Sequence, residues 1–178
     1  MASGESQALS AGATKAAIYQ QVMRQIDAVL EGETDLLAAM VSVVCLLHHA
    51  FDTYFWTGFY RRIGPDQLLI GPYQGTLGCL HIPFDRGVCG ACARSRQTVI
   101  VPDVHQFPGH IACDSRSNSE IVVPVFDRSG ELIAVFDVDS EQYAAFDQVD
   151  AEYLEQIMAR LARFEIGPLV VGASGPCS

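Results

Sequence analysis

Hydrophobic residues recur at helical spacing in three parts of the chain. The segment 14–30 predicts an amphipathic helix ending before Gly32, because its apolar residues lie on one face: Ile18, Val22, Ile26, Val29 and Leu30. The segment 35–49 predicts a second helix that is apolar on nearly all sides, so we expect deep burial and a core position for Cys45. The segment 147–164 predicts a closing amphipathic helix.

Strands are predicted as two hairpins with a short helix and a strand between them. The hairpins are 53–61 with 67–73, around Gly-Pro-Asp, and 119–126 with 131–139, around Asp-Arg-Ser-Gly. The intervening helix covers 87–96, and the strand covers 98–101. This order predicts an α+β domain over residues 13–166, with a central antiparallel sheet flanked by helices. We expect tails without fixed structure at 1–12 and 167–178.

Composition and charge exclude several classes of function. The chain has 178 residues, 49% of them hydrophobic and 18% charged, which is typical of one globular domain. A net charge of −10 disfavours nucleic acid and anionic membrane surfaces as partners. The sequence has no apolar run long enough to span a membrane, and the N-terminus lacks a signal-peptide pattern. We therefore expect a cytoplasmic protein.

The second hairpin gathers acidic residues at one end of the sheet. Side chains alternate along a strand, so Asp137 and Asp139 share one face. If the loop has an even number of residues, Glu120 lies opposite Asp137, and Asn118 lies opposite Asp139; a bulge would break this pairing. Crowded carboxylates raise one another's pKa, which makes a proton donor near neutral pH. The alternative is an ordinary solvated strand end.

The six cysteines are at positions 45, 79, 89, 92, 113 and 177. Without an export signal, structural disulfides are not expected, and the clustering suggests metal or redox chemistry. The pairs Cys79-x-His81, Cys89-x-x-Cys92 and His110-x-x-Cys113 offer zinc ligands, although their spacing is irregular. Thiol chemistry, with one cysteine attacking and another resolving the oxidised form, is the competing interpretation. Spacing alone leaves both open.

The chain resembles a known family in its longest motifs. These are the stretch 75–125, which includes GHIACDSRSNSEIVVPV, together with WTGFY at 56–60 and FDVDS at 136–140. From about residue 15 to 165 the sequence is similar to the free methionine-R-sulfoxide reductases, small stand-alone GAF-domain enzymes. The resemblance implies a GAF-like fold and thiol-dependent reduction of free L-methionine-R-sulfoxide, without cofactor or metal, recycled by thioredoxin.

The resemblance also implies roles for individual residues. The redox cysteines correspond to Cys79, Cys89 and Cys113. Cys113 is the expected nucleophile, which becomes a sulfenic acid, and Cys89 is expected to close a disulfide with it, joined by Cys79 through exchange. The sequence departs from the family pattern at Cys92, where a small residue without a thiol is expected, and we expect Cys92 to be a bystander.

The expected substrate site consists of acids and aromatic residues. Glu120, Asp137 and Asp139 correspond to the family's substrate-binding and proton-handling acids, and Trp56 corresponds to the aromatic wall for the S-methyl group. Tyr60 is expected beside Trp56 in the substrate site. His110, Arg116 and Ser119 are kept only as plausible neighbours of the site.

An alternative function belongs to a different class of protein. GAF modules of the sensor type bind a cyclic nucleotide or another small effector without chemistry and normally regulate an attached output domain, which we do not expect here. By resemblance we also expect a homodimer through the terminal helices.

Overall fold

The computed structural model describes residues 14–164, so the predicted tails and Cys177 lie outside the described residues. The helices are α1 (Lys15–Val29), α2 (Leu36–Ala50), α3 (Gly87–Ser95) and α4 (Gln148–Ala159), with short 3₁₀ turns η1 (Val104–Gln106) and η2 (Arg160–Arg163). The strands are β1 (Trp56–Arg62), β2 (Gln67–Gln74), β3 (His81–Pro83), β4 (Val99–Val101), β5 (Ser119–Phe126) and β6 (Leu132–Ser140). No helix among residues 14–164 is long and apolar enough to cross a membrane.

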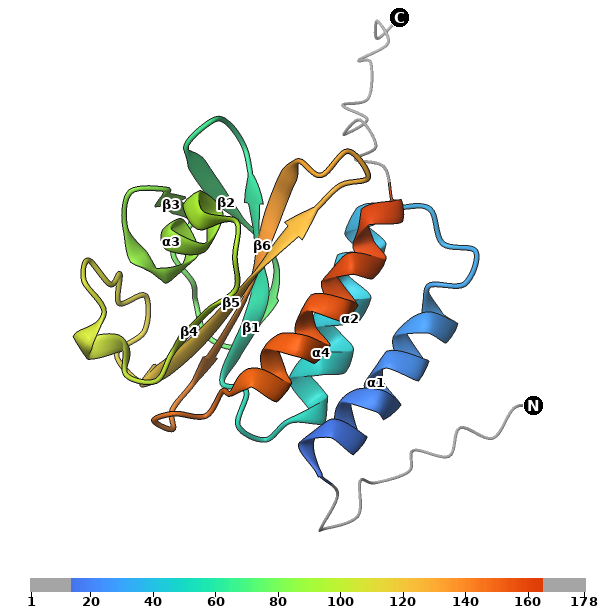
Figure 1. The fold of residues 1–178 in the computed structure, drawn as a ribbon, viewed down its shortest axis with the longest axis horizontal. Coiled ribbons are helices and arrows are strands. Elements are labelled where there is room, and N and C mark those ends of the chain that lie inside the picture. The colour runs from blue at the N-terminus through green and yellow to red at the C-terminus, as the bar shows by residue number, and fades with distance from the viewer. Residues whose placement is uncertain (1–13, 165–178) are drawn as a thin grey trace, which may run out of the picture.

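The strands form one antiparallel sheet in the order β3-β2-β1-β6-β5-β4. Helices α1, α2 and α4 lie together on one side of this sheet, and α3 lies on the other side (Figure 1). The predicted α+β class and sheet flanked by helices are therefore confirmed. The sequence interpretation missed β3, because His81–Pro83 contains a single buried apolar residue between a histidine and a proline. The equally short β4 was predicted, because its three residues are apolar and β-branched.

Strand alternation divides the buried residues between the two sides of the sheet. Phe59, Phe136 and Ile121 belong to the core under α1, α2 and α4. Their strand neighbours Tyr60, Val135 and Val122 belong to the smaller core under α3. Because side chains alternate, the acidic residues of β5 and β6 also face the α3 side. The site is therefore built where the sheet meets α3.

The deep burial predicted for α2 holds for only one of its faces, and the predicted core position of Cys45 is wrong. One face of α2 is buried, but Leu37, Val41 and Cys45 are exposed. These residues are four positions apart, so they lie along one helix face. Apolar residues on a helix do not require burial when the sheet and α1 cover only part of its circumference.

The predicted register of the second hairpin is also wrong. Phe126 pairs with Leu132 and not with Glu131, and the register shifts by one more residue between Val125 and Phe126. Together these two changes pair Glu120 with Asp139 and Val122 with Asp137. A shift by an even number of residues keeps every side chain on its face, so the acids still crowd together.

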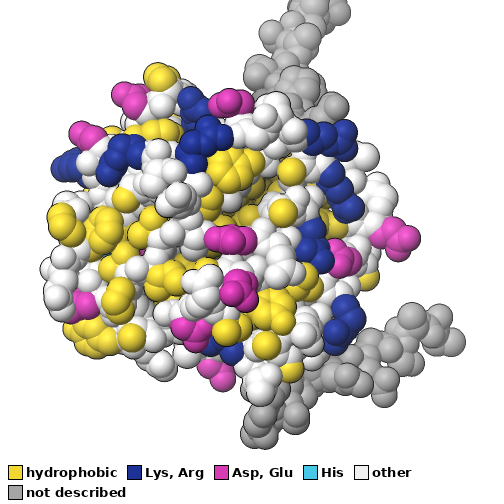
Figure 2. Space-filling view, viewed as in Figure 1, with side chains coloured by type: hydrophobic (Ala, Val, Ile, Leu, Met, Phe, Trp, Pro, Cys, Tyr) yellow, Lys and Arg dark blue, Asp and Glu magenta, His cyan; other side chains and the backbone are white. Residues whose placement is uncertain are grey.

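Charged side chains of both signs are spread over the face drawn in Figure 2. Lys and Arg gather there in small groups among acidic and uncharged residues and do not form one continuous basic surface.

Candidate active site

A cavity lies between the sheet and α3. Three of its walls come from β1, β5 and β6, and the others come from α3 and from the loops 75–80 and 107–118. Its lining residues are Phe55, Trp56, Tyr60, Leu77, Gly78, Ile82, Gly87, Val88, Cys89, His110, Ile111, Cys113, Asp114, Ser117, Glu120, Asp137 and Asp139. The expected residues Trp56, Tyr60, Cys89, Cys113 and the three acids all line it, whereas Cys79 contributes through its bond to Cys113.

Strand pairing places the acids in two adjacent rows. Trp56, Asp139 and Glu120 lie in one row across β1, β6 and β5. Asp137 occupies the next row, between Gly58 and Val122. Glu120 and Asp137 are each 5% exposed, whereas Asp139 is half-buried. Three carboxyl groups therefore converge on one cavity.

Burial raises the pKa of all three acids, and the charges of neighbouring carboxylates add to the effect. The pKa of Glu120 lies well above its usual value because of burial, and then because of the charges of Asp137 and Asp139. Burial and the Asp139 charge similarly raise the pKa of Asp137. Burial raises the pKa of Asp139 to about 7, although a hydrogen bond with Ser117 opposes the shift. The cluster therefore holds protons near neutral pH.

No Lys or Arg is among the described residues that line the cavity, and burial favours the neutral ring of His110. Within the described part of the chain, Asp137 Oδ1 is buried without a hydrogen-bond partner. An unpaired buried carboxylate oxygen costs free energy, and a bound cation or donor would recover that cost. The arrangement suits a ligand that carries a positive charge.

The raised pKa values predict how stability depends on pH. The folded pKa of Asp139 exceeds its unfolded value, so its contribution is present below about pH 4 and is lost as the pH rises through about 7. The free energy of unfolding should therefore fall over this range. At about pH 8, Asp139→Asn should raise the free energy of unfolding above that of the wild type by on the order of 1 kcal/mol. At about pH 4 the difference between variant and wild type should be smaller. Urea unfolding at both pH values measures this, and a variant less stable than the wild type at high pH would contradict it.

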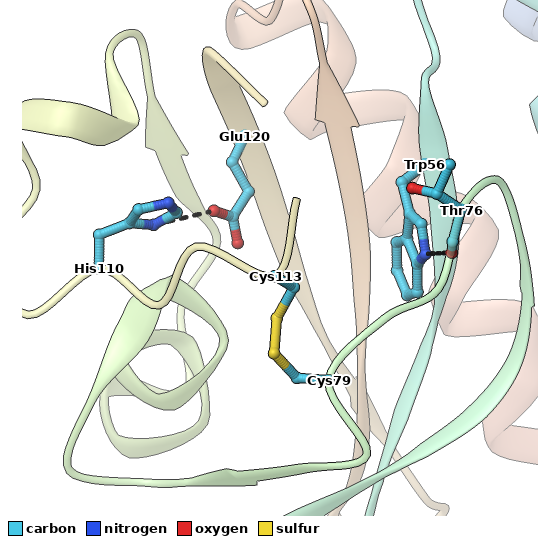
Figure 3. Close-up of a disulfide and its surroundings, with 6 residues drawn as sticks. All are labelled: Trp56, Thr76, Cys79, His110, Cys113 and Glu120. Carbon is cyan, nitrogen blue, oxygen red and sulfur yellow. Dashed lines mark hydrogen bonds and ion pairs between the residues drawn. A yellow bond between two sulfur atoms is a disulfide. The ribbon is translucent and has the colours of Figure 1, made fainter. Parts of the chain in front are cut away.

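Cys113 is bonded to Cys79 at the cavity mouth (Figure 3). The bond joins the loop 75–80 to the loop 107–118, and Cys113 is exposed while Cys79 is half-buried. This differs from the expected bond between Cys89 and Cys113. The two loops meet side by side, whereas Cys89 lies buried in α3 as a free thiol. The sequence offered no means to choose between these partners.

The thiols of α3 are protonated. Burial, followed by the charges of Asp137 and Glu120, raises the pKa of Cys89 well above its usual value, and the same causes raise the pKa of Cys92. Cys89 lines the cavity, but Cys92 does not. Neither thiol is therefore activated as a nucleophile in this state.

Trp56 forms an aromatic wall of the cavity. Its Nε1 donates a hydrogen bond of 3.0 Å to the carbonyl oxygen of Thr76 (Figure 3). Its ring stacks on Tyr60 at 5.6 Å and on Tyr73 at 5.3 Å between centroids. Gly58 makes room for this stack, because a Cβ there would lie 2.4 Å from Tyr73 Cβ and 2.7 Å from Trp56 Cη2.

We predict that Gly58→Ala displaces the Trp56 ring. The clash should lower the free energy of unfolding by about 1–3 kcal/mol and weaken substrate binding, because the aromatic wall moves. Trp56 is the only tryptophan of the chain, so its fluorescence reports the displacement directly. Gly64→Ala is the matched control, since a Cβ there meets nothing within 4 Å. Equal spectra and stabilities in both variants would contradict the prediction.

Arg116 and Ser119, which the sequence suggested as plausible neighbours of the site, do not line the cavity. The Arg116 guanidinium stacks over Phe55 at 4.2 Å and pairs with Asp114 at 3.2 Å. Asp114 in turn accepts a hydrogen bond of 2.8 Å from Thr76 Oγ1. Arg116 therefore braces the two loops from outside. Ser119 Oγ donates to the carbonyl oxygen of Gln142 and does not line the cavity.

His110, which the sequence analysis kept only as a plausible neighbour of the site, lines the cavity beside the acids. Its Nδ1 lies 3.9 Å from Glu120 Oε2 and is buried without a hydrogen-bond partner (Figure 3). Burial lowers its pKa, which favours the neutral ring. The sequence held an indication of this position, because His110 lies in the same polar stretch before β5 as Cys113 and Glu120. Ser117 and Phe55 also line the cavity. Ser117 lies within the stretch 109–125 and Phe55 directly precedes the motif 56–60, but neither was singled out from the sequence.

Comparisons with known proteins agree with this fold and cavity. The sequence profile of the GAF domain matches residues 31–164. The chain is 39% identical to the free methionine-R-sulfoxide reductase of Escherichia coli, over 84% of this chain and 89% of that protein. The reductase of the same name from Saccharomyces cerevisiae is 36% identical, over 83% and 86%. The crystal structure of the Neisseria meningitidis reductase in complex with its substrate superposes with a TM-score of 0.82 at 46% identity, covering 89% of this chain and 96% of that one.

The fold and the matched profile define a GAF-domain protein. Within that class, the chain belongs to the free methionine-R-sulfoxide reductase family. This membership favours an oxidoreductase over a sensor module that only binds a ligand.

Proposed function

We propose that the protein reduces free L-methionine-R-sulfoxide to methionine. The observation that carries this proposal is the convergence of a thiol pair, Cys79 and Cys113, with three acids of raised pKa in one cavity walled by Trp56. The thiol supplies electrons, the acids supply protons, and the aromatic ring suits an S-methyl group.

The first step consumes the sulfoxide. The Cys113 thiolate of the reduced enzyme attacks the sulfoxide sulfur, and an acid of the cluster protonates the departing oxygen. The attack forms a bond between Cys113 Sγ and the substrate sulfur. The protonated oxygen then passes to Cys113 Sγ as the substrate's S–O bond and the S–S bond both break, so that methionine leaves and Cys113 is left as a sulfenic acid. The cysteine sulfur is oxidised and the substrate sulfur is reduced by the same two electrons.

The second step closes a disulfide. We assign the resolving role to Cys79 in place of Cys89, because Cys79 is the residue bonded to Cys113. The Cys79 thiol attacks the sulfenic sulfur, and the oxygen leaves as water. A dithiol reductant of the thioredoxin type then restores both thiols and is itself oxidised. The exposure of Cys113 supports access by such a partner.

The cavity also accounts for a preference for free methionine. The ammonium group of the free amino acid carries a positive charge that pairs with the acids, for which the described cavity lining offers no Lys or Arg. A residue within a peptide has no such group. The buried acids Glu120 and Asp137 are the proposed partners of this ammonium. Location in the cytoplasm, where thioredoxin-type reductants keep thiols reduced, remains part of the proposal.

We predict activity on free L-methionine-R-sulfoxide and at least about a hundredfold lower kcat/KM on the N-acetylated sulfoxide, because acetylation removes the charge. The S-epimer should also be a poor substrate. An assay that couples thioredoxin oxidation to NADPH consumption measures all three rates. The sensor alternative predicts no turnover of any of them, and equal rates on free and acetylated substrate would contradict the proposed ammonium contact.

A homodimer remains a proposal, and the terminal helices are its expected interface. The exposed apolar face of α2, formed by Leu37, Val41 and Cys45, adds a surface adjacent to α1 that a second copy would cover. Sedimentation of the wild type and of Val41→Glu measures whether this face is involved.

A further inference from the structure

Cys89, Glu120 and Asp137 form a group of potential metal ligands in the cavity. One ligand atom of each lies within 4.8 Å of the others, and all three residues are buried. Within residues 14–164, this is the one group of three such ligands that the fold brings together. The pairs weighed as zinc ligands from the sequence, which involved His81, Cys92 and Cys113, do not form a group of this kind.

Two buried polar atoms at this group have no hydrogen-bond partner among the described residues and are free to bind an ion. Asp137 Oδ1 is buried without a hydrogen-bond partner, and the residue is 5% exposed. His110 Nδ1 is also unpaired and lies 3.9 Å from Glu120 Oε2. No lysine or arginine among the described residues lines the cavity. An acidic, buried and unpaired group of this composition favours a cation.

We propose that this cavity binds one Zn²⁺ ion when the substrate is absent, through Cys89 Sγ, Glu120 and Asp137, with His110 Nδ1 as the fourth ligand. Tetrahedral zinc places its ligand atoms roughly 3.4–3.7 Å apart. The ligand atoms of Cys89, Glu120 and Asp137 lie within 4.8 Å of one another, so side-chain rotation by about an ångström brings these three to such distances. His110 lies outside this group of three, with Nδ1 at 3.9 Å from Glu120 Oε2, and has to turn toward the ion to become the fourth ligand. The thiolate selects zinc over magnesium or calcium, which prefer oxygen ligands. Binding releases to solvent the proton of Cys89 and those held by Glu120 and Asp137, and it changes no oxidation state.

The zinc site overlaps the proposed ammonium site, because Glu120 and Asp137 belong to both. Zinc and substrate would therefore exclude each other, and zinc would inhibit the enzyme. The inhibition rests on the proposed function, whereas the binding rests only on the ligand geometry.

The test uses the oxidised full chain, in which Cys79 and Cys113 are bonded to each other and so are not ligands. Calorimetric titration with Zn²⁺ alone should give one site per chain, and titration with Co²⁺ alone should give a thiolate-to-cobalt charge-transfer band. Cys89→Ser should weaken zinc binding by at least about tenfold and remove the band. Cys92→Ser is the matched control, a buried thiol of the same helix that does not line the cavity. It should keep both signals.

Glu120→Gln provides a second test that leaves every thiol in place. It should weaken zinc binding while the charge-transfer band remains at saturating Co²⁺. Absence of a stoichiometric site in the oxidised wild type, or equal binding by the wild type and Cys89→Ser, would overturn the proposal.

A competition experiment separates this inference from the proposed function. Free L-methionine should raise the apparent Kd for zinc, and N-acetyl-methionine should leave it unchanged. Zinc binding that depends on Cys89 in a protein without reductase activity would support the metal site and contradict the proposed function. Reductase activity without any zinc binding would overturn the metal site alone.

Discussion

Replacing Cys113 by serine should reduce methionine formation to background. A hydroxyl is not ionised near neutral pH and cannot replace the thiolate that attacks the sulfoxide sulfur. The thiols of α3 do not compensate, because the pKa of Cys89 and of Cys92 is raised by burial. Reaction of the reduced variant with one equivalent of substrate, followed by quantification of methionine, measures the loss.

The control for this variant is Cys45→Ser, which alters an exposed cysteine of α2 outside the cavity. It should keep wild-type turnover. Cys79→Ser should give an intermediate result: it should form methionine once and then stall, because it lacks the proposed resolving thiol. Full single-turnover methionine formation by Cys113→Ser would assign the nucleophile to another residue.

The second large effect is expected at the buried acids. Glu120→Gln and Asp137→Asn should each lower kcat/KM by on the order of 10²-fold or more, because both the proton supply and the ammonium contact weaken. In the wild type, kcat should fall as the pH rises through about 7, where the cluster loses its proton, judged from the pKa of Asp139. The pH profile should shift in both variants.

Glu131→Gln is the matched control for these substitutions. Glu131 precedes β6, its side chain is 65% exposed, and it pairs with Arg62 at 3.6 Å. Its loss should leave kcat/KM and the pH profile unchanged. Unchanged pH profiles in Glu120→Gln and Asp137→Asn as well would mean that these carboxyls play no part in proton delivery.

The sequence predicted the fold wherever an element was long enough to show its period. Helices α1, α2 and α4, both hairpins and the short helix α3 begin within three residues of the predicted positions. β3 was missed because His81–Pro83 forms no apolar run, whereas the equally short β4 does. The position of Cys45 was predicted wrongly because an all-apolar helix does not reveal which of its faces has a partner.

The candidate site could be predicted only in part. Alternation along β6 placed Asp137 and Asp139 on one face, and this held although the register next to the turn was wrong. The partner of Cys113 could not be derived, because it depends on where two loops meet in space. Ser117 and Phe55 were missed for the same reason.

The central claim is that Cys113 takes the oxygen of free methionine sulfoxide. The most direct measurement is a single turnover of reduced Cys79→Ser with L-methionine-R-sulfoxide, in which methionine is quantified and the protein is trapped with dimedone for mass spectrometry. The account predicts one methionine per chain and one dimedone adduct, located on Cys113. Methionine formation with the adduct on Cys89, or no methionine at all, would contradict it.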